Sequence, residues 1–410
     1  LVEEFGHVSA GEREDEVERG RPNAAGWILP SRRSLHRRYP EVAILIPDSA
    51  GRACGGLCAV CQRMFDFQSG HLNFEIDKLY ADETWPHKME RLLGYFENDA
   101  QLRDILITGG DALMSTDRTL QQILEGVARM AARKREANRR RRPGDKHAEL
   151  VRVRLGSRLP AYLPQRVTPR LVEVLAAFRE RASELGVRQF VVQTHFESAM
   201  EVTPEAAQAI ERLQSAGWLV TNQLVFTAAA SRRGHTAKLR QVLSRLGVLP
   251  YYTFTVKGYR ENEHLFAPNA RSVQEQVEEK SLGHLSPKQI HELLEAAEDP
   301  AGLPALLGRR VGTPEMPFLA TDRSVLNLPG VGKSMTFRTV GITRDGRRVL
   351  AFDHDASRWH SPVIEHQGQI LVIESKSIRH YLEQLQAMGE PVDEYETLYG
   401  YSLGATEARM

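Results

Sequence analysis

Short apolar runs and helical stretches alternate through the middle of the chain. Apolar residues with helical spacing follow most of the runs and point to crossover helices. Strands that alternate with helices predict a parallel sheet with right-handed crossovers. Few of the runs alternate between apolar and polar residues, as expected of strands that are covered on both faces. The runs lie at 42–47, 104–109, 150–156, 189–195, 219–226 and 249–256, and the helical stretches at 119–136, 167–186, 203–216 and 235–246.

Polar residues at the ends of these runs decide between two parallel-sheet folds. Six strand–helix units fit either an incomplete (β/α)6 barrel or a doubly wound sheet. In a barrel the carboxyl ends of the strands meet at one mouth, where active sites are built. We therefore predict an α/β fold with an incomplete (β/α)6, partial TIM-type barrel. The polar groups at or near the strand ends are Gly109-Gly110-Asp111, Gly156-Ser157-Arg158, Thr194-His195, Asn222-Gln223 and Lys257.

The alternation of predicted strands and helices covers only the middle of the chain and so divides it into three parts. We expect an N-terminal arm at 1–36, the barrel at 37–280 and a C-terminal α+β extension at 281–410. The extension should contain a helix near 287–298. It should also contain a hairpin over 335–353 that turns at Asp345-Gly346, a favourable pair for a tight turn.

Composition narrows the class of protein. The chain has 410 residues, is 41% hydrophobic and carries a formal charge of +1, which gives no overall attraction to nucleic acid or membrane. The basic stretch 133–146 is read as a solvated surface insertion, with an anion or partner patch as the alternative. No apolar run approaches the roughly 20 residues that span a bilayer. We expect a soluble, cytoplasmic protein, whose natural N-terminus is missing because the chain begins with Leu1.

All three cysteines lie in one short stretch after the first predicted strand. Cys54, Cys58 and Cys61 have C-x3-C-x2-C spacing, and cysteines this close are poor disulfide partners. A zinc site usually needs a second cysteine pair, and a redox C-x-x-C motif would not need Cys54. Three thiolates on one loop suit a [4Fe–4S] cluster with one open iron. The spacing resembles the radical S-adenosylmethionine superfamily, and Gly109-Gly110-Asp111 resembles its glycine-rich motif.

A lysine stands in the glycine-rich stretch "NLPGVGKS" at 327–334. The phosphate-loop pattern would require glycine at 327 and a helix afterwards, but the chain has Asn327 and 335–341 reads as a strand. A lysine in a glycine-rich turn is also a good Schiff-base nucleophile, which implies pyridoxal phosphate bound through Lys333.

With both features present, the chain resembles the lysine 2,3-aminomutase family from about 36 to 355. The resemblance implies an isomerase that moves an α-amino group to the β-carbon, using a [4Fe–4S] cluster, S-adenosylmethionine and pyridoxal phosphate. The zinc-binding cysteines of some members are absent, so we predict no zinc. The matching stretches are "HRRYP", "CQR", "ITGGDAL", "VRLGSRLPAYLPQRVTP", "QTHFESAMEVTPEA", "NQLVF", "PYYTF" and the glycine-flanked Lys333.

The resemblance assigns roles to matching residues. It places Arg63 on the substrate carboxylate, as a bidentate arginine–carboxylate pair would require. Arg38 and Tyr39 match residues near the cofactor phosphate, while Val42 replaces a second basic residue. The residues expected near S-adenosylmethionine are Gly109, Gly110, Asp111, His195, Gln223 and Arg158, with a loop-bracing role open for Arg158. Tyr251 and Tyr252 should divide between core and pocket wall.

Two positions point to the substrate. Lysine-specific members hold the distal ammonium with two aspartates. The matching positions in this chain are Lys257 and Asn327, with Leu326 as the alternative to Asn327 if the register slips by one residue. Lysine and asparagine in place of the two aspartates resemble the pattern of the glutamate 2,3-aminomutases. A cation and an amide donor suit a γ-carboxylate. We therefore expect conversion of L-glutamate to β-glutamate, a reductant protein such as flavodoxin or ferredoxin, and a homo-oligomer. Another amino acid, a protein lysine, or a cluster-binding protein without turnover are the alternatives.

Overall fold

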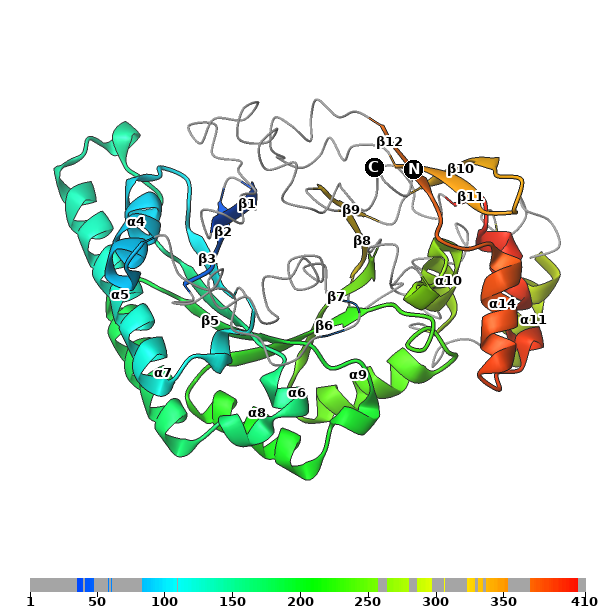
Figure 1. Ribbon diagram of the computed structural model, residues 1–410, viewed down its shortest axis with the longest axis horizontal. Helices are drawn as coiled ribbons and strands as arrows, with labels where there is room; N and C mark the ends of the chain where they lie inside the picture. The colour runs from blue at the N-terminus through cyan, green and yellow to red at the C-terminus, as the bar shows by residue number, and fades with distance from the viewer. Residues whose placement is uncertain are drawn as a thin grey trace.

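The computed structural model describes residues 35–39, 41–47, 58, 60, 83–108, 110–256, 264–279, 286–296, 306, 323–328, 331–334, 337–352 and 369–404. Its centre is a curved nine-stranded sheet in which the strands follow one another in chain order (Figure 1). The strands are β1 (Leu35–Tyr39), β2 (Val42–Leu45), β3 (Asp104–Ile107), β4 (Arg152–Gly156), β5 (Gln189–Thr194), β6 (Leu219–Val225), β7 (Leu249–Val256), β8 (Arg323–Leu328) and β9 (Val331–Ser334).

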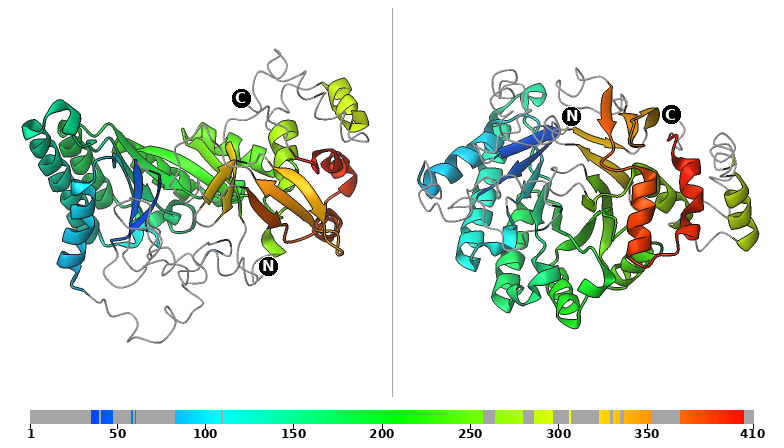
Figure 2. Two further views of the ribbon diagram at one scale, coloured as in Figure 1. Left: turned by 90° about the horizontal axis from the view of Figure 1, so that it is seen from above. Right: turned by 45° about the vertical axis from the view of Figure 1, so that its right-hand side comes forward.

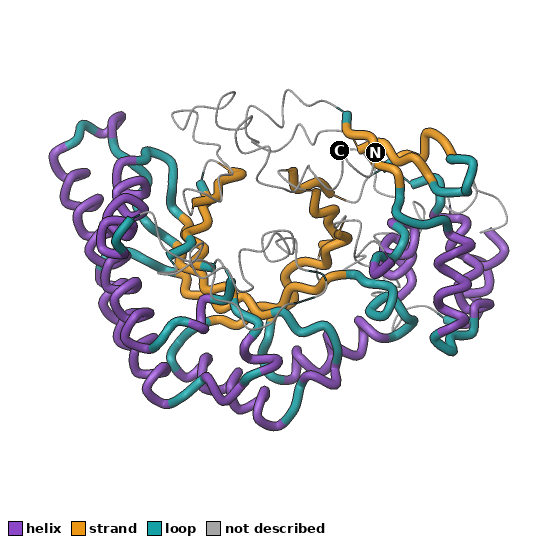
Figure 3. The backbone as a smooth tube through the Cα atoms, viewed as in Figure 1, coloured by secondary structure: helices purple, strands orange, loops and turns teal. Residues whose placement is uncertain are grey.

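The sheet confirms the predicted parallel architecture and extends it. The six predicted strands, β2 to β7, lie side by side and run parallel. A further strand, β8, pairs with β7 in parallel orientation, so the sheet is longer than predicted, and β1 and β9 add antiparallel edges. The sheet is strongly curved, and no pairing joins β1 to β9 in the described parts of the chain (Figure 3). The arrangement fits a partial TIM-type barrel.

Helices cover the convex side of the sheet (Figure 1), and the four predicted helical stretches are each confirmed by one of them. Thr168 and Thr203 cap two of them, because each hydroxyl accepts a backbone N–H at 3.2 Å and a proline follows in the first turn. The helices are α4 (Trp85–Asn98), α5 (Asp117–Arg140), α6 (Leu159–Tyr162), α7 (Pro169–Glu184), α8 (Pro204–Ser215) and α9 (His235–Arg245), with short turns η4 (Ala112–Met114), η5 (Pro143–Asp145), η6 (Pro164–Arg166) and η7 (Ala199–Glu201).

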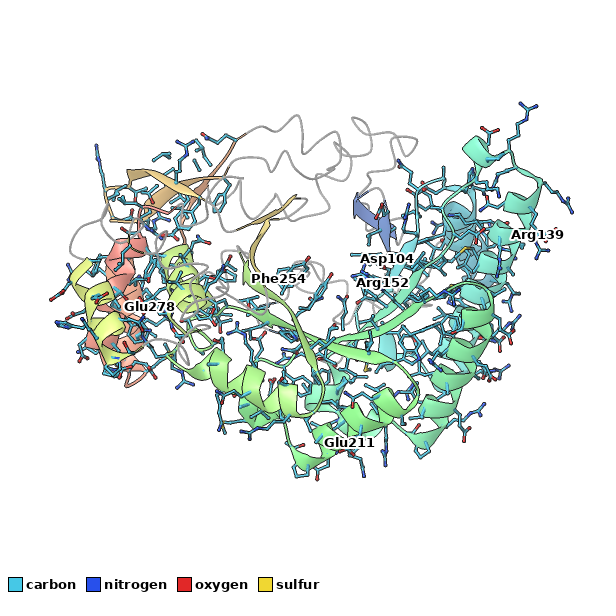
Figure 4. All side chains as sticks on the ribbon, turned by 180° about the vertical axis from the view of Figure 1, so that it is seen from behind. Asp104, Arg139, Arg152, Glu211, Phe254 and Glu278 are labelled. Atoms are coloured by element: carbon cyan, nitrogen blue, oxygen red, sulfur yellow. The ribbon has the colours of Figure 1, made fainter. Side chains whose placement is uncertain are left out.

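The two faces of the sheet differ in chemistry. In β4, Val153 and Leu155 are fully buried in the large apolar core that also contains residues of the surrounding helices. Alternation along the strand places Arg152 and Arg154 on the opposite, inner face. Figure 4 shows Asp104, Arg152 and Phe254 on this inner side of the curved sheet. The parallel strands therefore enclose a partly polar interior.

The basic stretch 133–146 was predicted to be a solvated surface insertion, but part of it belongs to a helix that packs against the protein. Residues 133–140 of this stretch form the last turns of α5, which ends at Arg140. Lys134 is buried, and its ammonium donates to the Phe96 and Leu102 carbonyl oxygens at 3.0 Å each. Arg139 and Arg140 lie exposed beyond it, as predicted for a solvated surface, and Figure 4 shows Arg139 at the outer tip of α5.

The C-terminal part forms a small second sheet beside the barrel (Figure 2). The predicted hairpin is confirmed as β10 (Arg338–Ile342) and β11 (Arg348–Phe352), with Gly346 at φ +80° in the turn. The predicted helix near 287–298 is α11 (Pro287–Ala296). The remaining elements are β12 (Ile370–Ile373), α10 (Asn269–Gln274), the π-helix η9 (Glu275–Glu279), α14 (Ile378–Ala387) and η10 (Val392–Tyr401).

A buried ionic cluster joins this part to the barrel, because the Tyr401 hydroxyl of η10 donates to Glu278 Oε1 of the cluster at 2.9 Å. Arg271 is fully buried, contacts the Glu279 carboxylate and donates from Nε to the Ser231 carbonyl oxygen at 3.0 Å. Arg233 pairs with Glu278 at 2.5 Å. The predicted boundary at 280 stays a prediction. No described helix is long and apolar enough to cross a bilayer.

Candidate functional site

The predicted polar rim lies where the parallel strands end. Gly110 and Asp111 follow β3, Arg158 follows β4, His195 follows β5 directly, and Gln223 lies within β6. Because these strands are neighbours in the sheet, the structure brings their carboxyl ends to one edge. In α/β barrels, active sites are built at this edge of the sheet.

Asp111 links the loop after β3 to the loop after β4 by hydrogen bonds. Its carboxylate is buried and accepts the Leu113 N–H at 2.9 Å through Oδ1 and the Arg158 N–H at 2.6 Å through Oδ2. Burial raises the pKa of Asp111 above its ordinary value, although hydrogen bonds from Ser157, Arg158 and Leu113 oppose that shift. Asp111 thus orders the loop after β3 against the loop after β4.

Arg158 carries the densest set of contacts at the rim. Its Nη1 donates to Cys58 Sγ at 3.0 Å, Nη2 to Glu201 Oε1 at 2.8 Å, and Nε to the His195 carbonyl oxygen at 3.1 Å. Burial would lower the pKa of the guanidinium, but the hydrogen bond and charge of Cys58 and the charge of Glu201 raise it. Arg158 therefore remains a cation against the half-buried Cys58.

Two glutamates at the rim were missed by the sequence analysis. Glu201 pairs with Arg158, and its Oε2 accepts the Glu197 N–H at 2.6 Å. Glu197 Oε1 contacts His195 Nε2 and accepts the Val225 N–H at 3.1 Å. The signal for them was weak: both lie in the quoted stretch "QTHFESAMEVTPEA", but neither follows a strand directly.

The two polar residues of β6 have different surroundings. Asn222 is buried; its Oδ1 accepts the Phe196 N–H at 2.7 Å and its Nδ2 donates to the Phe196 carbonyl oxygen at 3.1 Å. Asn222 therefore braces the loop after β5. Gln223 is half-buried and pairs in register with Tyr252, so it is the one of the two placed toward the interior.

A charged cluster in the barrel interior was also missed. Arg154 Nε donates to Asp104 Oδ1 at 2.8 Å, Arg154 Nη1 to Gln193 Oε1 at 3.3 Å, and Arg152 Nη1 to Asp104 Oδ2 at 3.3 Å. Burial raises the pKa of Asp104, against the lowering effect of Arg154. The signal was the "RVR" of β4, which places two arginines on one face of a strand.

Tyrosines of β7 continue this interior surface. Tyr251 and Tyr252 are both half-buried, with ring centroids 4.2 Å apart, so they do not divide into core and wall as predicted. Burial raises the pKa of Tyr251 to about 12. Tyr252 also lines a small cavity between β6, β7 and α9. The Tyr251 phenol therefore stays protonated at neutral pH.

Several predicted site residues lie outside the described residues: Cys54, Cys61, Arg63, Gly109 and Lys257. For others the structure gives the backbone alone. Tyr39 pairs with Val42, and Arg38 lies beside it in β1. Asn327 pairs with Val256 on one side and Gly332 on the other, and Lys333 pairs with Leu326. Lys333 thus lies in the short strand β9, where the sequence predicted a turn.

The surroundings of Cys58 fit the predicted iron–sulfur site. Hydrogen bonds to cysteine sulfurs are among the features with which proteins tune iron–sulfur centres. Arg158 supplies such a hydrogen bond to Cys58 Sγ at 3.0 Å. Within the described residues no group of three histidine, cysteine or acidic side chains could hold a metal. A cluster at this rim would therefore depend on Cys54 and Cys61 as well.

Comparison with known proteins identifies three informative relatives. An uncharacterized KamA family protein of Methanocaldococcus jannaschii is 28% identical over 89% of this chain and 48% of its own length. The L-lysine 2,3-aminomutase of Clostridium subterminale is 31% identical, and the glutamate 2,3-aminomutase of Clostridioides difficile 28% identical, each over 62% of this chain and 51% of the relative. The chain thus spans about half the length of these relatives. No protein-family model matches it.

Proposed function

The chain belongs with the lysine 2,3-aminomutase family of its relatives, and from this premise we propose that it is a radical 2,3-aminomutase. The reaction would be an isomerisation that moves the α-amino group of an amino acid to its β-carbon. The observation that carries the proposal is the contact of Arg158 with Cys58, a cysteine of the C-x3-C-x2-C motif, at the carboxyl edge of the parallel strands. This is where the fold would place a reactive cluster.

Three cofactors belong to this proposal. Cys54, Cys58 and Cys61 would ligate a [4Fe–4S] cluster, which with S-adenosylmethionine supplies one-electron radical chemistry. Gly109, Gly110, Asp111, His195 and Gln223 would border the S-adenosylmethionine site. Pyridoxal phosphate would bind through Lys333, with Arg38 and Tyr39 near its phosphate, and supplies stabilisation of the migrating nitrogen.

The protein's own residues would bind, orient and shield. Arg63 would bind the substrate α-carboxylate in bidentate fashion. Tyr252 and Phe254, whose ring centroids lie 5.7 Å apart on the interior side of β7, would exclude water from the reacting groups. Asp111 would keep the loops after β3 and β4 in one arrangement, since it bonds to the backbone of both. Holding the reacting groups in one geometry lowers the barrier of a reaction.

We propose L-glutamate as substrate and β-glutamate as product. Lys257 and Asn327 stand where a cation and an amide donor would face the distal carboxylate. Val256, which precedes Lys257 in the sequence, pairs with Asn327 between β7 and β8, and this pairing supports the proposal; Lys257 itself lies outside the described residues. A reductant such as flavodoxin or ferredoxin would supply the electron, and we propose a cytoplasmic homo-oligomer.

Anaerobic reconstitution tests the proposal. The protein is loaded with iron, sulfide and pyridoxal phosphate, and iron is counted in the wild type and in Cys58→Ala. We expect about four irons per wild-type chain, the content of one [4Fe–4S] centre, and formation of 5′-deoxyadenosine from S-adenosylmethionine on reduction. Cys58→Ala should lose both. Full cleavage of S-adenosylmethionine by Cys58→Ala would sink the proposal, and a loaded wild type without turnover would favour a cluster-binding protein instead.

A further inference from the structure

Each nitrogen of the Arg158 guanidinium is bound to a protein group. Its three nitrogens donate to Cys58 Sγ, Glu201 Oε1 and the His195 carbonyl oxygen, while its backbone N–H donates to Asp111. The side chain is only 22% exposed. A planar guanidinium with three fixed contacts has little freedom to turn.

The partner of Arg158 is anchored as well. Glu201 closes the short turn η7, and its second carboxylate oxygen accepts the Glu197 N–H at 2.6 Å. Glu201 Oε1 therefore orients the Arg158 guanidinium, and Glu201 Oε2 orders the loop after β5. This arrangement keeps Nη1 directed at the sulfur of Cys58.

We propose that Arg158 is a positioning residue that sets the reduction potential of the cluster bound by Cys58, through its hydrogen bond to the Cys58 sulfur. The inference rests on the proposed function, because it requires the cluster. Reduction adds negative charge to the iron–sulfur centre and its thiolates. A fixed cation that donates to one of those sulfurs stabilises the reduced form and raises the potential, since charge and sulfur hydrogen bonds tune such centres.

The test is a redox titration of the reconstituted protein, followed by the electron paramagnetic resonance signal of the reduced cluster, without S-adenosylmethionine. The variants are Arg158→Gln, which removes the cation, and Arg158→Lys, which keeps the charge but not the three-way geometry. Arg166→Gln is the matched control. Arg166 is also an ion-paired, partly buried arginine, at 18% exposure, and it contacts Asp117 and Ser115 instead of Cys58.

Arg158→Gln should make reduction at least about tenfold less favourable, which is about 59 mV for one electron. Arg158→Lys should shift the potential in the same direction by less, and Arg166→Gln should leave it unchanged. An unchanged potential in Arg158→Gln with full iron content overturns the inference. So does weaker binding of S-adenosylmethionine at unchanged potential, because Arg158 would then be a ligand contact.

The outcomes separate the inference from the function on which it rests. If the wild type binds no cluster, both the proposed function and the inference are contradicted. A wild type that binds the cluster, with variants that do not shift, contradicts the inference alone. If Arg158→Gln binds no iron, the inference is tested by the reduction potential of the cluster in Arg158→Lys. A potential equal to that of the wild type then contradicts the inference.

Discussion

Replacing Arg154 by methionine should destabilise the protein severely, although the residue lies away from the proposed cluster. Arg154 is buried in the barrel interior and donates to Asp104 at 2.8 Å. The Asp104 side chain is 8% exposed, so it cannot recover the lost partner from water. Methionine fills similar space but leaves a buried carboxylate with one partner, Arg152, at 3.3 Å.

The magnitude follows from breaking a buried pair. Removing one partner of a buried ion pair costs about 3–5 kcal/mol, because the other charge stays desolvated. Arg152 remains, so we expect about 3 kcal/mol, near the lower limit of that range. The loss should also raise the pKa of Asp104 further, since Arg154 is the group that lowers it most.

The assay is urea unfolding of the protein without cofactors, with the unfolding free energy compared at equal urea dependence. Adding Asp104→Asn to Arg154→Met should recover part of the loss, because the charge that lacks a partner is then gone. Arg170→Met is the control: Arg170 pairs with Glu173 at 61% exposure, so the cost should be within about 0.5 kcal/mol. An Arg154→Met protein within about 1 kcal/mol of the wild type would refute the reasoning, since that is the cost of an exposed pair.

Three further predictions concern the rim, the pH dependence and the substrate. Asp111→Asn should cost about 1–3 kcal/mol in urea unfolding, because an amide can accept only one of the two backbone N–H groups that the carboxylate accepts; an unchanged midpoint would contradict that role. Burial raises the pKa of Asp104 above 3.8, so the native state binds its proton more tightly than the unfolded state. The unfolding free energy of the wild type relative to Asp104→Asn should therefore fall as pH rises above 3.8, and a rise would show the opposite sign. Lys257→Asp, which reverses the charge proposed to face the substrate, should depress glutamate turnover and admit some lysine; unchanged glutamate turnover would remove Lys257 from the site.

The strands and helices of the barrel could be predicted because each is marked by its own periodicity. The run at 249–256 matches β7 (Leu249–Val256) residue for residue, and the helical stretch predicted at 203–216 is α8 (Pro204–Ser215) with Thr203 as its N-cap. The strand β8 could not be predicted in this way. Its sequence RSVLNL is short and lies far along the chain from β7, so only the assembled sheet shows their parallel pairing.

The candidate site was predictable as a rim but not as a network. Parallel strands bring their carboxyl ends together, so the prediction that Asp111, Arg158 and His195 share an edge needed only strand order. The contact of Arg158 with Cys58 joins residues 100 positions apart in sequence. Such a contact depends on loop conformation and side-chain direction, which periodicity does not encode.

The most direct test of the proposed function is a product assay. The reconstituted, reduced protein is incubated anaerobically with S-adenosylmethionine and with L-glutamate or L-lysine under identical conditions, and the products are separated and identified by mass and retention. We predict β-glutamate from glutamate and no β-lysine from lysine. The absence of a β-amino acid from either substrate, with the cluster fully loaded, would contradict the aminomutase proposal, and faster rearrangement of lysine would contradict the proposed substrate.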